Sequence, residues 1–188
     1  AEKKAAAIIV SQEVELPKQS ETTLIRVEDT RYALAFVSAA WFDHPAKKLT
    51  TIGITGTKGK TTTTYLVKSI LENAGRKVGL VGTIEIIIGD THIHAVNTTP
   101  ESYLLQEYFA KMVESGCDTV VMEVSSQALM LHRTQGFVFD FGIFTNLEPD
   151  HIGPNEHGSF EEYAHCKSLL FQQCRVGIAN CDDVHWQL

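Results

Sequence analysis

The sequence lacks an excess of positive charge, and this argues against several kinds of partner. Its 188 residues hold 16 Lys and Arg against 23 Asp and Glu, for a net charge of −7. A nucleic-acid groove or an anionic membrane surface needs a basic face, so the composition argues against both. Phosphate binding stays open, because it needs only a few local cations and backbone amides.

Paired cysteines are also missing. The four cysteines form no C-x-x-C motif, which is typical of reduced thiols in a cytosolic protein. Cys174, Cys181 and His185 lie close in sequence, but their spacing is not a usual zinc pattern. We therefore expect free thiols and a cytoplasmic location. The cysteines are Cys117, Cys166, Cys174 and Cys181.

Long apolar runs are absent as well. No segment reaches the ~20 apolar residues that a membrane-spanning helix needs, and the first residues do not have the pattern of a signal peptide. The chain opens on AEKKAAAIIV without an initiator Met, and it stops where a new helix could begin. We expect no membrane partner, and we expect the chain to be a piece of a longer protein.

The pattern of residues 1–46 predicts a small α/β unit. Two short runs rich in β-branched residues are typical of strands. Asp29 is a candidate N-cap for the helix that follows, whose apolar residues recur at helical spacing. Pro45 ends that helix, and residues 44–48 look like a linker. The predicted elements are strands at 6–10 and 22–27 and a helix from 30 to about 42.

From residue 47 to 188, strands and helices alternate, which predicts an α/β fold with a doubly wound, mostly parallel sheet. Gly89-Asp90 indicates a hairpin, Thr99 before Pro100 a helix N-cap, and Ser159 with Glu162 a capping box. The predicted strands are 49–55, 78–81, 84–88, 91–96, 119–124, 138–145 and 176–179. The predicted helices are 60–73, about 100–116 and about 160–174.

The segment Gly56–Thr62, GTKGKTT, has the features of an ATP phosphate-binding loop, because it lies between a predicted strand and a predicted helix. Its glycines let backbone amides converge on an anion, and the helix adds the positive end of its dipole. Lys60 can reach the β- and γ-phosphates, and Thr61 can bind Mg²⁺. The residues assigned to ATP here are Gly56, Thr57, Lys58, Gly59, Lys60, Thr61 and Thr62.

The loop is shorter than the usual G-x-x-x-x-G-K-[ST] motif, because Gly53 stands one place too early. A plain glycine turn before a helix would give the same GKT triplet. An ordinary P-loop kinase or GTPase is a second alternative. Neither alternative accounts for the polar residues farther along the chain.

Four polar residues lie at or beyond the ends of strands or on a helix later in the chain. Parallel sheets bind ligands at the carboxyl ends of their strands. Glu123 ends an apolar run, and a buried carboxylate is costly unless it is paired or bound to metal. Asn146 follows the next strand, and we assign it to the nucleotide. His151 is a candidate metal ligand, although a solvated histidine fits equally. Lys167 lies among apolar residues, where a snorkelling lysine is the alternative.

Five motifs in order resemble the Mur ligases of peptidoglycan synthesis, and among them the MurE-type branch that adds the third, diamino residue. The resemblance runs from about residue 22 to 181. It implies three domains, of which this chain would hold the tail of the N-terminal UDP-binding domain (1–46) and most of the central ATPase domain (47–188), without the C-terminal ligase domain. The motifs are TGTKGKTT, NTTPE, MEVSSQAL, FTNLEPDH and EEYAHCKSLLF.

The resemblance implies an ATP-dependent amide ligase that adds meso-diaminopimelate or L-lysine to UDP-MurNAc-L-Ala-D-Glu through an acyl phosphate. It implies that Lys60 holds phosphates, and that Thr61 and Glu123 bind one Mg²⁺. His151 and Lys167 would serve a second Mg²⁺, with Lys167 carbamylated by CO₂ to N6-carboxylysine. That reaction needs a neutral amine, hence a lowered pKa. The substrate contacts implied are Asn97, Thr98, Thr99, Ser125 and Arg133.

Some alternatives stay open within the resemblance. Leu131 and Lys58 stand where the family commonly has glutamine and asparagine. The chain could belong to another Mur ligase or to a folylpolyglutamate-synthase-like ligase. As a piece of the enzyme it could also bind ATP without turnover, and we expect it to be a monomer.

Overall fold

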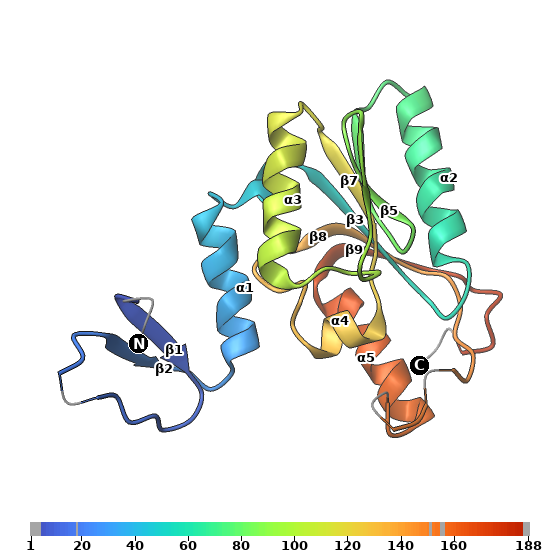
Figure 1. Cartoon of the computed structure of the whole chain (residues 1–188). Helices are drawn as coiled ribbons and strands as arrows, with labels where there is room; N and C mark the ends of the chain where they lie inside the picture. The colour runs from blue at the N-terminus through green and yellow to red at the C-terminus, as the bar shows by residue number, and fades with distance from the viewer. Residues whose placement is uncertain (1–4, 18, 151, 155–156, 186–188) are drawn as a thin grey trace.

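The computed structural model describes residues 5–17, 19–150, 152–154 and 157–185 (Figure 1). Near the N-terminus, β1 (Ala7–Val10) and β2 (Thr23–Arg26) form a parallel two-stranded sheet. Helix α1 (Thr30–Trp41) follows, and the 3₁₀ helix η1 (Pro45–Lys48) joins it to the larger part of the chain. The expected linker at 44–48 is therefore largely helical.

A seven-stranded sheet forms the larger part, in the order β6-β5-β4-β7-β3-β8-β9. Neighbours from β4 through β9 pair in parallel, and β5 pairs antiparallel with both β4 and β6. The predicted mostly parallel sheet and the hairpin at Gly89-Asp90 are confirmed. The strands are β3 (Thr50–Thr55), β4 (Val78–Val81), β5 (Glu85–Ile88), β6 (Thr91–His94), β7 (Thr119–Glu123), β8 (Phe139–Phe144) and β9 (Cys174–Ala179).

Helices cover both faces of this sheet, as Figure 1 shows for α2 and α3. Helix α2 (Lys60–Asn73) packs on the face that carries Ile52 and Ile54. Helices α3 (Ser102–Glu114) and α5 (Phe160–Gln172) pack on the other face. Because both faces are buried, the central strands are continuous apolar runs rather than alternating ones.

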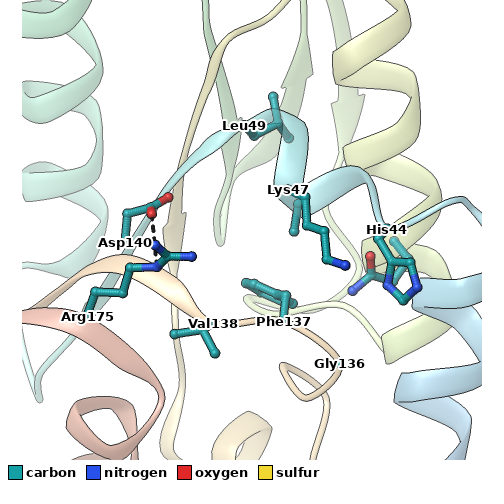
Figure 2. Close-up of a pocket in the computed structure, with 10 residues that line it drawn as sticks. His44, Lys47, Leu49, Gly136, Phe137, Val138, Asp140 and Arg175 are labelled. Carbon is teal, nitrogen blue, oxygen red and sulfur yellow. Dashed lines mark ion pairs between the residues drawn. The ribbon is translucent and has the colours of Figure 1, made fainter.

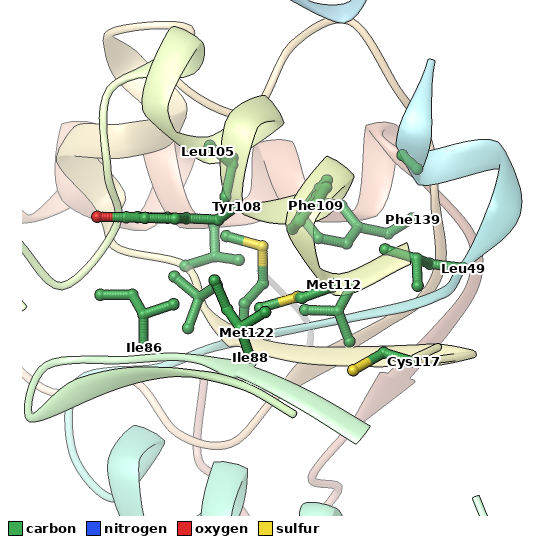
Figure 3. Packing of buried hydrophobic residues seen from close by; sticks show 14 of the residues in the cluster. Leu49, Ile86, Ile88, Leu105, Tyr108, Phe109, Met112, Cys117, Met122 and Phe139 are labelled. Carbon is green, nitrogen blue, oxygen red and sulfur yellow. The ribbon is translucent and has the colours of Figure 1, made fainter. Parts of the chain in front are cut away.

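The larger core cluster lies between α3 and the sheet (Figure 3). Phe109 and Met112 of α3 are fully buried, as is Met122 of β7. Phe137 packs edge-on against Phe109 and Phe139, with ring centroids 5.3 and 4.8 Å apart. This cluster anchors β7 and β8, whose carboxyl ends carry polar residues of the site described below.

Two predicted caps are confirmed and one is wrong. Asp29 and Ser159 accept backbone hydrogen bonds at the starts of α1 and α5. Helix α3 begins at Ser102 instead of after Thr99, and its N-cap Glu101 makes no side-chain cap bond. The Thr99 hydroxyl donates instead to the backbone carbonyl at the end of β7 (2.9 Å).

One helix end differs from the prediction, and one helix was missed. Helix α5 ends at Gln172, because Cys174 already pairs with Phe139 as the first residue of β9. The short helix α4 (Ser126–Met130) was not predicted, and Ser125 caps it by accepting from the Ala128 amide. The predicted domain boundary between residues 46 and 47 stays a prediction.

All four cysteines are free thiols. No helix in the described part of the chain has both the length and the apolar character needed to cross a membrane.

We expect Phe109→Ala to lower the free energy of unfolding by about 3–5 kcal/mol, because it leaves a cavity in a fully buried cluster. Urea unfolding followed by circular dichroism measures this. Glu114→Ala, at an exposed position of the same helix, is the control, and its effect should stay within about 0.5 kcal/mol. Equal effects of the two substitutions would contradict the assignment of this core.

Candidate active site

The candidate site lies at the carboxyl ends of β3, β7 and β8. β3 pairs in parallel with both neighbours, so the segments that follow all three strands meet at one edge of the sheet. The segment after β3 is the loop 56–59, which leads directly into α2. Thr62 follows on the first turn of α2 and is exposed.

Gly56 is required by its surroundings. Its φ is +148°, a value that side chains rarely adopt. A Cβ there would also lie 2.0 Å from the Thr145 hydroxyl. Gly59, with φ of +79°, is the N-cap of α2. The loop therefore has the predicted form: a glycine-rich turn that ends at a helix N-terminus.

Asn146 braces this loop from the side of β8. Its Oδ1 accepts from the Lys58 amide, and its Nδ2 donates to the Lys58 carbonyl, both at 2.9 Å. The Thr57 amide donates to the Asn146 carbonyl (3.0 Å), and the Tyr163 hydroxyl donates to Thr57 Oγ1 (3.1 Å). Asn146 was predicted to contact nucleotide, and these bonds show that it holds the loop backbone.

Lys58 does not point its charge into the loop. Its ammonium pairs with Glu148 at 2.5 Å on the exposed surface. The hydrogen bond and the charge of Glu148 raise the pKa of Lys58. The charge of Lys58, a residue that the sequence assigned to ATP, is therefore partly neutralised in this structure.

Two lysines converge on one backbone oxygen. Lys60 Nζ and Lys167 Nζ donate to the Gly56 carbonyl at 2.9 and 2.7 Å. Lys167 is only 1% exposed, which excludes the snorkelling alternative. Burial, and then the charge of Lys60, lower the pKa of Lys167 to about 7, while Asp150 acts in the opposite direction. Burial lowers the pKa of Lys60 as well.

Glu123 is 1% exposed and lies opposite the start of α2. It accepts from the Thr61 hydroxyl (3.0 Å), the Thr83 amide (2.8 Å) and the Thr83 hydroxyl (3.1 Å). A Cβ on Gly82 would lie 2.7 Å from Glu123 Oε1, so that glycine makes room for the carboxylate. No ion pair to Glu123 forms within the described ranges, so the salt-bridge alternative has no support there.

A carboxylate beside a hydroxyl is the kind of oxygen pair that binds Mg²⁺. Glu123 and Thr61 therefore fit a metal ion by their chemistry. Thr83 was not foreseen from the sequence. The Gly82-Thr83 pair just after β4 is the signal that could have indicated it, since this strand also ends at the loop edge.

A cavity of about 250 Å³ brings the predicted residues together. It contains both lysines and all five residues that the sequence assigned to substrate. Ser126 and Gln127, which were not predicted, also line it. The lining is Lys60, Asn97, Thr98, Thr99, Ser125, Ser126, Gln127, Arg133 and Lys167.

Arg133 brings a cation to this cavity. Its guanidinium pairs with Glu101 (2.8 Å) and donates to the Thr99 carbonyl (3.2 Å). Its buried Nε has no hydrogen-bond partner among the residues described. The arginine is therefore placed to donate to an anionic group.

His151, the predicted second metal ligand, lies outside the described residues. Another histidine in the same loop, His157, was not singled out by the sequence. It is fully buried, and its Nε2 lies 2.8 Å from Ser126 Oγ. Its ring also contacts Tyr163, so it connects the cavity wall with α5.

Comparison with known proteins places this geometry in a family. Residues 54–188 match the Mur ligase middle domain. The chain belongs to the Mur ligase family. Among curated relatives of this Mur ligase chain, the UDP-N-acetylmuramoyl-L-alanyl-D-glutamate–2,6-diaminopimelate ligase of Clostridium perfringens is 49% identical over 96% of the chain. The enzyme of the same name from Bacillus licheniformis is 48% identical over 92%.

The chain spans only 37% and 34% of the lengths of these two relatives. A solved 2,6-diaminopimelate ligase of the same name superposes with a TM-score of 0.81 at 25% identity, over 96% of this chain and 36% of that one. Folylpolyglutamate synthase from Mycobacterium tuberculosis, solved with ADP and AMPPCP, gives 0.61 at 16% identity over 82% and 42%. That second likeness shows the fold alone.

Lys167 should make stability depend on pH. Its pKa is about 7 in the folded chain and near 10.5 when unfolded, so the unfolded state holds more protons between these values. The free energy of unfolding should therefore gain up to about 1.4 kcal/mol per pH unit over this window, relative to Lys167→Met. Urea unfolding from pH 6 to 10 in CO₂-free buffer measures the gain.

The exposed Lys77→Met is the control for this measurement and should keep the pH dependence of the wild type. A wild-type curve parallel to that of Lys167→Met across the window would contradict a depressed pKa for the buried amine.

Proposed function

We propose that this chain is the ATP-binding part of a ligase that adds 2,6-diaminopimelate to UDP-MurNAc-L-Ala-D-Glu. The observation that carries the proposal is the convergence of Lys60, Lys167 and Arg133 on one cavity beside the buried carboxylate of Glu123. The names of the relatives support diaminopimelate, instead of L-lysine, as the amine. Because the chain spans 37% of these relatives, turnover is proposed for the full-length enzyme and nucleotide binding for this chain.

The phosphates of ATP would lie against the loop. Its amides and Lys60 would hold them, and Thr61 and Glu123 would hold a Mg²⁺ ion through hydroxyl and carboxylate oxygens. ATP supplies the phosphoryl group that converts a poorly electrophilic carboxylate into an acyl phosphate. The Lys60 ammonium, now on the Gly56 carbonyl, would move to the phosphates when nucleotide binds.

Lys167 is proposed to be carbamylated. A neutral amine attacks CO₂, an N–C bond forms and one proton leaves, so the product is an anionic carbamate. The pKa of about 7 supplies the neutral amine near physiological pH. The exchange replaces one of two neighbouring cations by an anion, and together with His151 this carboxylysine would suit a second Mg²⁺.

The muramoyl-dipeptide would occupy the cavity beside these groups. Arg133 has an unpaired Nε–H for a carboxylate or phosphate, and Asn97, Thr98, Thr99 and Ser125 would add hydrogen bonds. We place the full-length enzyme in the cytoplasm as a monomer. The 188 residues alone are proposed to bind ATP without turnover.

The full-length protein should release phosphate from ATP only when UDP-MurNAc-L-Ala-D-Glu and diaminopimelate are both present. A coupled phosphate assay with each substrate omitted in turn measures this. Lys60→Ala should abolish release and weaken ATP binding to the 188-residue chain. Phosphoryl transfer to a hydroxyl acceptor would favour a kinase and sink the ligase proposal.

Full-length Lys167→Ala should be inactive and should regain part of its activity with short carboxylates, which replace the carbamate as a metal-binding anion. Lys60→Ala is the matched control and should not respond, because its loss is that of a cation. Native mass spectrometry of the wild type should find one CO₂ adduct, absent from Lys167→Ala. Full activity of Lys167→Ala would remove the carbamate from the proposal.

A further inference from the structure

A second cavity, of about 280 Å³, lies away from the candidate active site (Figure 2). Its walls come from η1, from α3 and from the amino ends of β8 and β9, which is the sheet edge opposite the phosphate loop. The described lining shares no residue with the candidate active site. A ligand here would therefore not overlap a ligand in the candidate active site.

This cavity has an excess of positive charge. Arg175 Nε lies 3.5 Å from Asp140 Oδ1, while Asp140 Oδ2 accepts from the amide and hydroxyl of Thr51 at 2.9 and 3.2 Å. Lys47 forms no ion pair within the described ranges. Figure 2 shows its side chain extending toward His44, with the Asp140–Arg175 pair on the opposite side of Phe137. One carboxylate, already engaged by a strand, thus faces two cations.

A buried side-chain amide in the cavity wall has an oxygen that accepts no hydrogen bond from the described residues. Gln106 is 1% exposed and lines the cavity, and its Oε1 has no hydrogen-bond partner among the residues described. Buried polar atoms are nearly always paired, so an orphan acceptor beside a cavity indicates a group that a ligand would satisfy. The lysines of the candidate active site cannot donate a hydrogen bond to this oxygen, because they lie at the opposite edge of the sheet.

Apart from His44, most of the remaining wall is apolar. Phe137 packs edge-on against Phe109 and Phe139, which belong to the core, and Leu49 is buried beside it. Such a surface favours a ring or a branched aliphatic group over a bare ion. Lone phosphate or chloride would leave both this surface and Gln106 without a partner.

We propose that this cavity binds a small organic acid whose apolar body carries a hydroxyl or amino donor. Its carboxylate pairs with Lys47, whose ammonium forms no ion pair within the described ranges. Its body packs on Phe137 and Leu49, and its donor serves Gln106 Oε1.

The probe is 3-hydroxybenzoate, titrated into the ¹⁵N-labelled 188-residue chain. Benzoate, which lacks the donor, and 3-hydroxybenzamide, which lacks the charge, are the matched compounds. We expect saturable amide shifts at residues 136–138 with little change at residues 56–62, and tighter binding of 3-hydroxybenzoate by about fivefold over benzoate and about tenfold over the amide. The unfolding temperature should rise with ligand concentration.

Two variants separate the contacts. Lys47→Met should weaken 3-hydroxybenzoate about tenfold and reduce the salt dependence of binding. Gln106→Leu should bind benzoate normally and lose the preference for the hydroxylated acid. Lys48→Met, a neighbouring lysine that pairs with Asp43 and does not line the cavity, is the control and should bind as the wild type. The amide spectrum away from residues 136–138 reports that each variant is folded.

Absence of saturable shifts with all three compounds, or equal affinities in Lys47→Met and wild type, would overturn the proposal. Lys60→Ala should retain 3-hydroxybenzoate binding while it loses ATP. The two proposals therefore fail separately: a wild-type chain that binds the acid but not ATP would disqualify only the ligase function, and a wild-type chain that binds ATP but not the acid would disqualify only this site.

Discussion

The buried Lys167 and the partly buried Lys60 both donate to one carbonyl oxygen just after β3, and much of the site is arranged around this contact. Placing like charges close together away from water is unfavourable, and the chain reduces the cost by lowering the pKa of both amines. The Tyr163 ring, 4.6 Å from Lys167 Nζ, adds a favourable face for the buried charge. Glu123 and Asp150 supply the opposing charge.

The neighbouring elements follow from this constraint. Gly56 must present its carbonyl while Thr145 occupies the space where a side chain would be. Asn146 and Tyr163 then hold the loop from outside, so the carbonyl stays aimed at both lysines. The two lysines around one oxygen acceptor suit a ligand with several anionic oxygens, because each protonated amine can donate to such an oxygen.

Many helix and strand bounds could be predicted from the sequence, because they depend on the spacing of apolar residues close together in the chain. The bounds of α2 at Lys60–Asn73 and of β4 at Val78–Val81 agree with the pattern of apolar residues, and the caps at Asp29 and Ser159 agree with side-chain chemistry. Thr99 misled the prediction, because a threonine before proline looks like a cap whether its hydroxyl serves its own helix or, as here, a distant strand.

Site residues that lie at strand ends could be predicted from the sequence. Site residues whose position depends on how distant segments come together could not. Glu123 could be predicted from its position at the end of β7, and Lys60 from its position after β3. Thr83 and His157 depend on which side chains the sheet order and the loop after β8 bring together, and no local pattern encodes that. The exclusion of the snorkelling alternative for Lys167 likewise required its depth in the structure.

One carboxylate pairs with two arginines from different parts of this fold. Glu101 holds Arg31 of α1 at 3.3 Å and Arg133 of the cavity at 2.8 Å. An anion that binds Arg133 competes for the same positive charge and frees Glu101 to hold α1 more firmly. By thermodynamic reciprocity, firm seating of α1 strengthens anion binding to the same degree. Glu101 thus links the charge of Arg133 in the cavity to the N-terminal helix through one shared carboxylate.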